Sequence, residues 1–184
     1  MKNSDQIKIK ETEIQGIYIL EDFVFMDSRG SFTKKYNIEL FEKCGLDLKI
    51  KEQYFTFSKK GTIRGMHFQL PPFEENKLIY VPKGEIVDVL LDLRKKSDTY
   101  GKHISIKLSE KMSNSIYVPE GIAHGYQVLT DDTVVIYLSS NVYSKSCYTG
   151  VYWNSFGMKW PLQNPEVSEK DSSLVTFDQF VSPF

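Results

Sequence analysis

The sequence contains many short apolar segments, and their spacing is the feature that most constrains the fold. Segments such as IQGIYIL, QYFTFS, KLIYVP and TVVIYLSS are rich in β-branched and aromatic residues, and Gly, Pro, Asn, Asp or Ser separates them. Windows with the apolar period of a long amphipathic helix are nearly absent. The pattern therefore predicts an all-β sandwich or barrel.

One or two short helices are expected within this all-β chain. In NIELFEKCGL, Asn37 is a helix cap, Leu40, Phe41 and Cys44 share one face, and Gly45 ends the helix. A second short turn is predicted at SEKDSS near the carboxyl end.

Length and charge indicate a single domain without a general affinity for polyanions. The 184 residues suffice for one hydrophobic core, and no linker or composition shift divides them, so residues 1–184 are predicted to form one domain. The 23 Lys plus Arg against 24 Asp plus Glu give a net charge of -1, which offers no field to attract nucleic acid or an anionic membrane.

Location and redox state follow from segments that the sequence lacks. There is no secretory signal pattern and no run of about 18 apolar residues, so we expect a cytoplasmic protein. Cys44 and Cys147 stand apart from each other and from the histidines, so neither a disulfide framework nor a cysteine metal site is expected.

The three histidines differ in their surroundings. His103 lies in GKHISIKL, an alternating strand in which a polar position is expected to face solvent. By contrast, His67 in RGMHFQ and His124 in PEGIAHGY stand among residues that bind or move charge. These two are the candidates for chemistry.

Pro119, Gly121 and His124 have the order P-x-G-x-x-H, which is similar to the second motif of the cupin superfamily of jelly-roll proteins. Metal-binding cupins carry H-x-H in their first motif, whereas this chain reads His67-Phe68-Gln69 and lacks the second histidine. A two-histidine metal site therefore remains an alternative. Acid–base chemistry explains the same residues better.

A longer series of segments resembles the nucleotide-sugar 3,5-epimerases, typified by dTDP-4-dehydrorhamnose 3,5-epimerase. The segments keep the family order over residues 29–171: RGSF, KKGTIRGMHFQ, KLIYVPKGEIVDVLLDLRKKSDTYGK, IYVPEGIAHGYQVL, VIYLS, VYWNSFGMKWP and SEKD. This resemblance implies an all-β cupin-type double-stranded β-helix (jelly roll), no metal and no other cofactor. It also implies a homodimer and a role in making deoxyhexoses for bacterial surface polysaccharide.

The resemblance assigns four catalytic residues to a known kind of chemistry. The carbonyl of a 4-keto sugar acidifies the C–H bonds at carbons 3 and 5, so epimerisation requires a base, an oxyanion stabiliser and an acid on the opposite face. By resemblance His67 is the base, Asp171 orients it, Lys77 stabilises the enolate and Tyr137 returns the proton. No redox cofactor is needed.

Further residues are assigned to a nucleotide-diphosphate sugar. Arg64 is placed to bind the pyrophosphate, because guanidinium binds phosphate oxygens bidentately, and Arg29 and Phe32 are expected to reach the partner's pocket. The complete set of predicted substrate-binding residues is Arg64, His124, Arg29, Phe32, Lys34, Gln53 and Gln69.

Two departures from the family pattern leave the substrate open. Lys34 stands where relatives carry an acidic residue after R-G-x-F, and the stretch Glu52 to Thr56 replaces Q-D-N-H-S. If the missing acid reads the N3–H of thymine, a lysine suits cytosine instead. The alternatives are an epimerase of a CDP-linked 4-keto deoxysugar acting at one carbon, a metal-dependent cupin enzyme, and a non-catalytic nucleotide-sugar-binding cupin.

Overall fold

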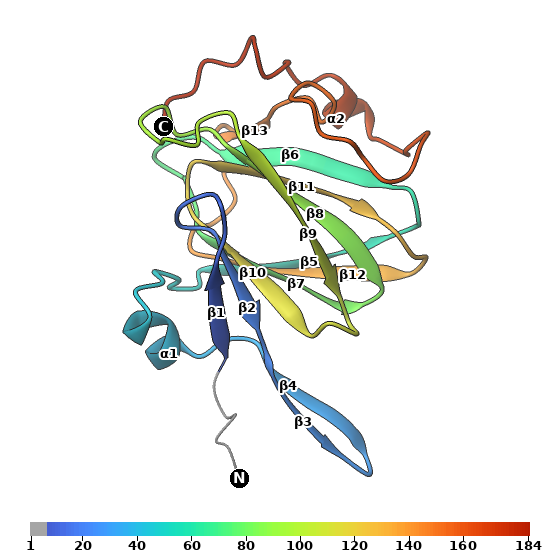
Figure 1. The fold of residues 1–184 in the computed structure, drawn as a ribbon. Coiled ribbons are helices and arrows are strands. Elements are labelled where there is room, and N and C mark those ends of the chain that lie inside the picture. Colours follow the sequence, from blue (N-terminus) through green and yellow to red (C-terminus); the bar gives the residue numbers. More distant parts are fainter. Residues whose placement is uncertain (1–6) are drawn as a thin grey trace.

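The structure is a computed structural model that describes residues 7–184, which form thirteen strands and two short helices. The strands gather into two large antiparallel sheets that face each other, and a separate hairpin extends away from them (Figure 1). The predicted all-β class is confirmed.

The two sheets draw on strands that are distant in sequence. The six-stranded sheet has the order β1 (Lys8–Glu11), β2 (Tyr18–Glu21), β10 (Asn114–Val118), β7 (Lys77–Lys83), β12 (Thr133–Ser139) and β5 (Glu52–Ser58). The five-stranded sheet has the order β13 (Tyr148–Gly150), β6 (Ile63–Gln69), β11 (Ile122–Val128), β8 (Glu85–Asp92) and β9 (His103–Ser109). In each large sheet, neighbouring strands are mostly not consecutive in the chain.

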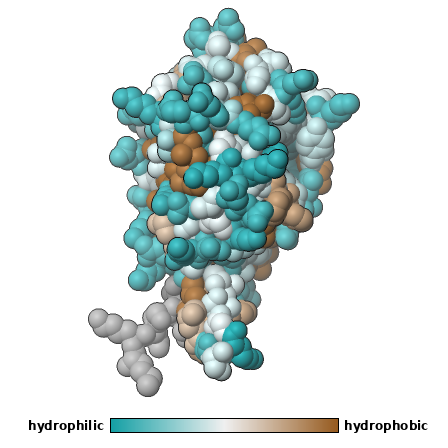
Figure 2. All heavy atoms as spheres, turned by 90° about the vertical axis from the view of Figure 1, so that its right-hand side faces the viewer, coloured by the Kyte–Doolittle hydropathy of each residue, from teal (hydrophilic) through white to brown (hydrophobic). Residues whose placement is uncertain are grey.

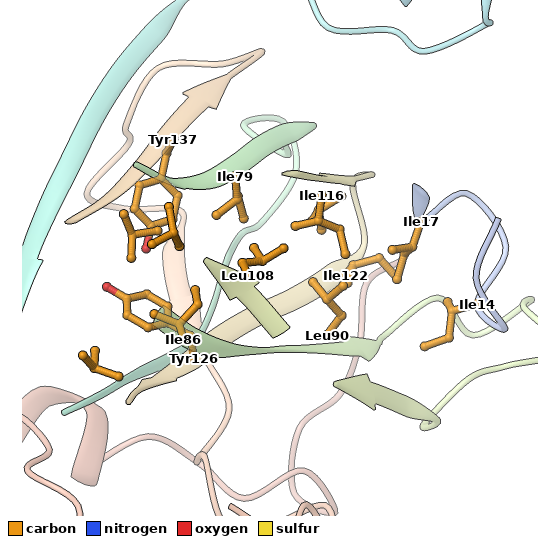
Figure 3. Close-up of a cluster of buried hydrophobic side chains, with 14 residues drawn as sticks. Ile14, Ile17, Ile79, Ile86, Leu90, Leu108, Ile116, Ile122, Tyr126 and Tyr137 are labelled. Atoms are coloured by element: carbon orange, nitrogen blue, oxygen red, sulfur yellow. The ribbon is translucent and has the colours of Figure 1, made fainter. Parts of the chain in front are cut away.

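Apolar side chains fill the space between the sheets, and Figure 3 shows them pointing inward from both layers. On β8, Ile86 and Leu90 belong to this core, whereas Val89 and Leu91 pack on the other face of the sheet. That other face is covered by the C-terminal segment, including Phe180. The strand is buried on both faces, which explains why its apolar pattern does not alternate cleanly.

The first helix, α1 (Ile38–Lys43), begins and ends where the sequence predicts. Asn37 accepts a hydrogen bond from the backbone N–H of Leu40 at 3.0 Å, and Gly45 follows the helix with a φ of +72°. Phe41 is buried, but the prediction that Cys44 shares its face is wrong, because Cys44 is the C-cap residue and is exposed.

The second helix, α2 (Glu169–Ser172), is a single turn capped by Ser168. Both cysteines are free thiols. No helix in residues 7–184 is long and apolar enough to cross a membrane.

A hairpin of β3 (Phe23–Asp27) and β4 (Gly30–Lys34) projects from the sandwich (Figure 1). It carries exposed apolar side chains, with Phe25 52%, Met26 68% and Phe32 58% exposed. Hydrophobic atoms on this projection are visible at the bottom of Figure 2. Among residues 7–184 neither of the two large sheets pairs with this hairpin.

Candidate active site

The two candidate histidines meet because their strands are neighbours in the five-stranded sheet. His67 on β6 lies directly opposite His124 on β11 in the antiparallel register. The strands are unusually close beside this pair, since a Cβ placed on Gly65 would lie 2.5 Å from the Cα of Gly125. Gly65 also has a φ of +129°, a conformation that glycine adopts without strain. Glycine at both positions therefore permits the close approach.

His67 is oriented by Asp171, which α2 brings from the far end of the chain. His67 Nε2 lies 2.8 Å from Asp171 Oδ1, and Asp171 Oδ2 accepts a hydrogen bond of 3.0 Å from the backbone N–H of Gly65. Burial raises the pKa of Asp171, but the hydrogen bond with His67 and the other donors outweigh it and hold the pKa below its usual value. Burial lowers the pKa of His67, against the opposing effect of Asp171, so the imidazole is uncharged at neutral pH and can accept a proton.

His124 forms a second pair of the same kind with Asp88 of β8. His124 Nε2 lies 2.6 Å from Asp88 Oδ1, and Asp88 is completely buried. Its Oδ2 has no hydrogen-bond partner among residues 7–184. Burial raises the pKa of Asp88, although His124 acts in the opposite direction.

The opposite wall is formed by the six-stranded sheet and carries Lys77 and Tyr137. Lys77 on β7 is buried and its Nζ lies 2.9 Å from Glu75 Oε1. Tyr137 on β12 stacks on Tyr54 of β5, with ring centroids 4.6 Å apart. Burial raises the pKa of Tyr137 well above its ordinary value, so its phenol remains a proton donor.

A cavity of about 120 Å³ separates the two walls. It is lined by Tyr54, Thr56, Arg64, His67, Lys77, His124, Tyr126, Tyr137 and Tyr148. An outer hollow of about 360 Å³ shares Tyr54 and Tyr148 with it and is also lined by Glu52, Gln69, Glu75 and Tyr143. The structure thus brings together all four predicted catalytic residues, since Asp171 touches His67, and adds Arg64 and His124.

The remaining predicted substrate-binding residues lie elsewhere. Gln69 lines the outer hollow, but its amide already bonds to the backbone of Phe73, Val142 and Ser144. Gln53 is exposed and does not line the cavity, because it alternates on β5 with Tyr54, which does.

Arg29, Phe32 and Lys34 are on the projecting hairpin and also do not line this chain's cavity. Arg29 forms an ion pair with Asp27, and both line a shallow hollow on the hairpin with Phe32. His103 lies on β9 and packs beside Phe156. It does not line the cavity.

Several residues of the site were not predicted from the sequence. Tyr126 and Asp88 each follow a period-two rule that would have found them: Tyr126 is two residues after His124, and Asp88 lies two residues after Ile86 on the inward face of β8. Glu75, the ion-pair partner of Lys77, lies in no motif that would have indicated it.

Within residues 7–184 no three His, Cys, Asp or Glu side chains converge as a metal site. His67 and His124 instead each direct Nε2 at one carboxylate.

Comparison with known proteins gives the family. The sequence model described as dTDP-4-dehydrorhamnose 3,5-epimerase matches residues 11–179. The chain belongs to the dTDP-4-dehydrorhamnose 3,5-epimerase family. The epimerase of this name from Shigella flexneri is 37% identical over 181 residues, which cover 95% of this chain and 100% of the relative.

Solved dTDP-4-dehydrorhamnose 3,5-epimerases have the same fold. The Bacillus anthracis enzyme, with TDP and pyrophosphate bound, has a TM-score of 0.90 and 37% identity and covers 93% of this chain and 99% of its own. A Legionella pneumophila 3,5-epimerase in complex with dTDP-4-keto-L-rhamnose has a TM-score of 0.91 at 27% identity, with 96% and 95% covered. The predictions of a cupin jelly roll and of a carbohydrate epimerase are confirmed.

Proposed function

We propose that this chain, acting as one cupin domain, epimerises a nucleotide-diphospho-4-keto-6-deoxyhexose in deoxysugar synthesis. The observation that carries the proposal is the position of the base and the acid on opposite walls of one cavity. His67 comes from the five-stranded sheet, and Tyr137 comes from the six-stranded sheet. A sugar ring between them has one face toward a base and the other toward an acid, as inversion at carbon requires.

The proton is removed by His67. Its Nε2 faces Asp171, which leaves Nδ1 as the ring nitrogen able to accept a proton from carbon 3 or carbon 5. The negative carboxylate of Asp171 stabilises the imidazolium that forms and fixes the tautomer beforehand. Two acceptor contacts, to His67 and to Gly65, hold that carboxylate in place.

The resulting enolate is stabilised by Lys77, and the inverted centre is completed by Tyr137. The ammonium of Lys77 is buried, so its attraction for an enolate oxygen is stronger than it would be in water. Tyr137 then donates its phenolic proton to the opposite face of the carbon. Arg64, in the same cavity, is placed to bind the diphosphate, and its Nε is held by Ser58 Oγ at 3.1 Å.

The nucleotide is proposed to be dTDP, which the relatives named above act on or bind. A CDP-linked sugar is the competing substrate, because Lys34 replaces the acidic residue of the family motif on the hairpin. Epimerisation at both carbons is proposed on the same grounds, with a single carbon as the competing outcome.

We also propose a homodimer. The exposed Phe25 and Phe32 of the hairpin and the exposed Phe55 (69%) and Phe57 (57%) of β5 form apolar surfaces that residues 7–184 leave uncovered. Strand β5 is an edge strand, so a second chain can cover it. Sedimentation at micromolar concentration tests this arrangement, and a monomer would contradict it.

The activity is tested by proton NMR in deuterated water with dTDP- and CDP-linked 4-keto-6-deoxyglucose. We expect the signals at carbons 3 and 5 to disappear with the dTDP sugar and to persist with His67→Ala. Exchange only with the CDP sugar would support the Lys34 argument, and loss of one signal alone would indicate a one-carbon epimerase. Binding without exchange would contradict the enzyme assignment and favour a binding protein.

A further inference from the structure

The carboxyl group of Asp88 is enclosed in the apolar core between the two sheets. It is completely buried, and its neighbours on the inward face of β8, Ile86 and Leu90, belong to the core that Figure 3 shows. Asp88 Oδ1 lies 2.6 Å from His124 Nε2, and Oδ2 has no hydrogen-bond partner among residues 7–184. A negative charge on this carboxyl would therefore be stabilised by one donor only, in surroundings of low dielectric constant.

The other titratable groups that face this pair are phenols. Tyr126 lies opposite Asp88 in the register of β8 and β11. From the six-stranded sheet, the ring of Tyr137 packs edge-on against His124, with ring centroids 5.9 Å apart. A phenol supplies no positive charge, so neither tyrosine can balance a carboxylate.

The two cationic side chains of the cavity do not balance a charge on Asp88 either. Lys77 forms its ion pair with Glu75, and the Nε of Arg64 donates a hydrogen bond to Ser58 Oγ. In the part of the chain that the structure describes, the imidazole beside Asp88 is the only basic group within ion-pair distance of it. A neutral carboxyl–imidazole pair therefore costs less than a pair with a net negative charge.

Neutrality of the pair places a proton on the second ring nitrogen of His124. One proton lies between Asp88 Oδ1 and His124 Nε2, and it can belong to either atom. Whichever atom holds that proton, the pair is neutral only when a second proton is on Nδ1. If the first proton is on the carboxyl, Oδ2 is a carbonyl oxygen, which tolerates the lack of a donor better than a carboxylate oxygen does.

We propose that Nδ1 of His124 carries a proton and donates it in a hydrogen bond to an oxygen atom of the bound sugar, whereas Nδ1 of His67 accepts. This inference rests on the proposed function, in which a nucleotide-diphosphate sugar fills the cavity. His124 lines that cavity, and its Nδ1 is not among the enclosed polar atoms that lack a partner in residues 7–184. Asp88 does not line the cavity and is a positioning residue, because it acts through the imidazole.

The surroundings of His67 favour the opposite tautomer. Asp171 accepts a hydrogen bond of 3.0 Å from the backbone N–H of Gly65, and its other oxygen lies 2.8 Å from His67 Nε2. With a donor at each oxygen this carboxylate keeps its charge and accepts from Nε2–H, so Nδ1 of His67 has the lone pair that a base needs. Burial raises the pKa of Asp88, whereas the donors around Asp171 hold its pKa below the usual value.

The two tautomers can be measured in the free protein, which contains only three histidines. NMR of protein labelled with ¹⁵N-histidine correlates each ring nitrogen with the carbon-bound ring protons and shows which nitrogens are protonated. The variants His67→Asn, His103→Asn and His124→Asn assign the signals. At pH 7 we expect a proton on Nδ1 of His124 and none on Nδ1 of His67. The same Nε2–H tautomer at both histidines would overturn the proposal.

Replacements of Asp88 test the consequence for the reaction. Asp88→Leu keeps a side chain of similar size but removes the partner of His124 Nε2, so KM for dTDP-4-keto-6-deoxyglucose should rise by about 10-fold while kcat changes less. Asp88→Asn should recover most of this loss, because its amide N–H can donate to Nε2 as a protonated carboxyl does. Asp171→Asn makes the same change at the other pair, where it should impose the wrong tautomer on His67 and lower kcat/KM by on the order of 10²-fold.

The results separate the possible failures. If folded Asp88→Asn loses as much activity as Asp171→Asn, Asp88 must be charged, and the proposal is wrong. The NMR measurement needs no replacement of Asp88, so it decides the question even if Asp88→Leu does not fold. Failure of the original protein to exchange carbon-bound hydrogen in either the dTDP- or the CDP-linked sugar would overturn the proposed function, and with it the sugar contact of His124. Equal tautomers at the two histidines would overturn this inference alone.

Discussion

His67 and His124 lie side by side on β6 and β11, yet the carboxylates that they contact differ. Asp171 has hydrogen-bond partners on both oxygens and a lowered pKa, whereas Asp88 has one oxygen without a partner among the described residues and a raised pKa. The side chain of His67 is 19% exposed and that of His124 is 6% exposed. Two similar pairs are thus placed in different electrostatic surroundings.

Pairing with a carboxylate therefore does not by itself make a histidine a base. A carboxylate that remains charged can stabilise the imidazolium formed after proton removal. A fully buried carboxylate with a raised pKa retains a proton more readily, which suits a fixed hydrogen-bonding contact. We therefore assign proton abstraction to the His67–Asp171 pair and substrate contact to the His124–Asp88 pair.

The largest loss of activity is expected when His67, rather than His124, is replaced. His67→Asn should reduce exchange of the carbon-bound hydrogens by about 10³-fold, which is within the usual contribution of a general base. Deuterium uptake in deuterated water measures this, with circular dichroism as the check on folding. A loss smaller than that caused by His124→Asn would reverse the assignment.

The next effect concerns the orienting carboxylate. Asp171→Asn should lower kcat/KM by on the order of 10²-fold, because the imidazolium loses its stabilising charge. Activity in the original enzyme should fall as the pH drops through the pKa of His67, which lies below its ordinary 6.5. Since Asp171 raises that pKa, the acidic limb of the pH–activity profile of Asp171→Asn should move to lower pH. A limb that moves to higher pH would contradict this account.

A smaller effect is expected at the second histidine. His124→Asn should reduce kcat/KM by about 10-fold, through weaker binding of the sugar rather than loss of the base. The exchange rate at saturating substrate should change less than KM. If the exchange rate instead falls as far as in His67→Asn, the two pairs share the role of base.

The smallest effect is on stability. The pKa of Asp88 is raised above its ordinary 3.8, so this carboxyl contributes stability at low pH that is lost as the pH rises through its folded pKa. Asparagine does not titrate. The free energy of unfolding of Asp88→Asn, relative to the original protein, should therefore increase as the pH rises from 4 to 8. A constant difference between the two proteins in the free energy of unfolding by urea over that range would show that the pKa of Asp88 is not shifted.

Sequence patterns predicted the strands better than their pairing. HISIKLS coincides with β9, and Asn37 and Gly45 bound α1 as expected. The contact of His67 with Asp171 spans 104 positions and depends on how the chain closes, so only the family resemblance could indicate it.

Residues without a motif were harder to find. The period-two pattern places Asp88 on the inward face of β8, but its contact with His124 depends on the register of β8 and β11. The exposure of Cys44 was also unpredictable, because a shift of one residue in the helix end decides whether Cys44 lies in the last turn or at the C-cap. The local sequence pattern predicts helices and strands, whereas the contacts between distant segments can be known only from the three-dimensional fold.

If a base and an acid act from opposite walls of the cavity, Tyr137→Phe should remove one role and leave the other. The measurement is the ratio of deuterium uptake to inversion at carbon 5, followed by NMR in deuterated water. We expect uptake to continue with retained configuration, because His67 still removes and returns the proton on its own face, while inversion falls by at least about 10²-fold. Equal loss of uptake and inversion would contradict the separation of the two roles.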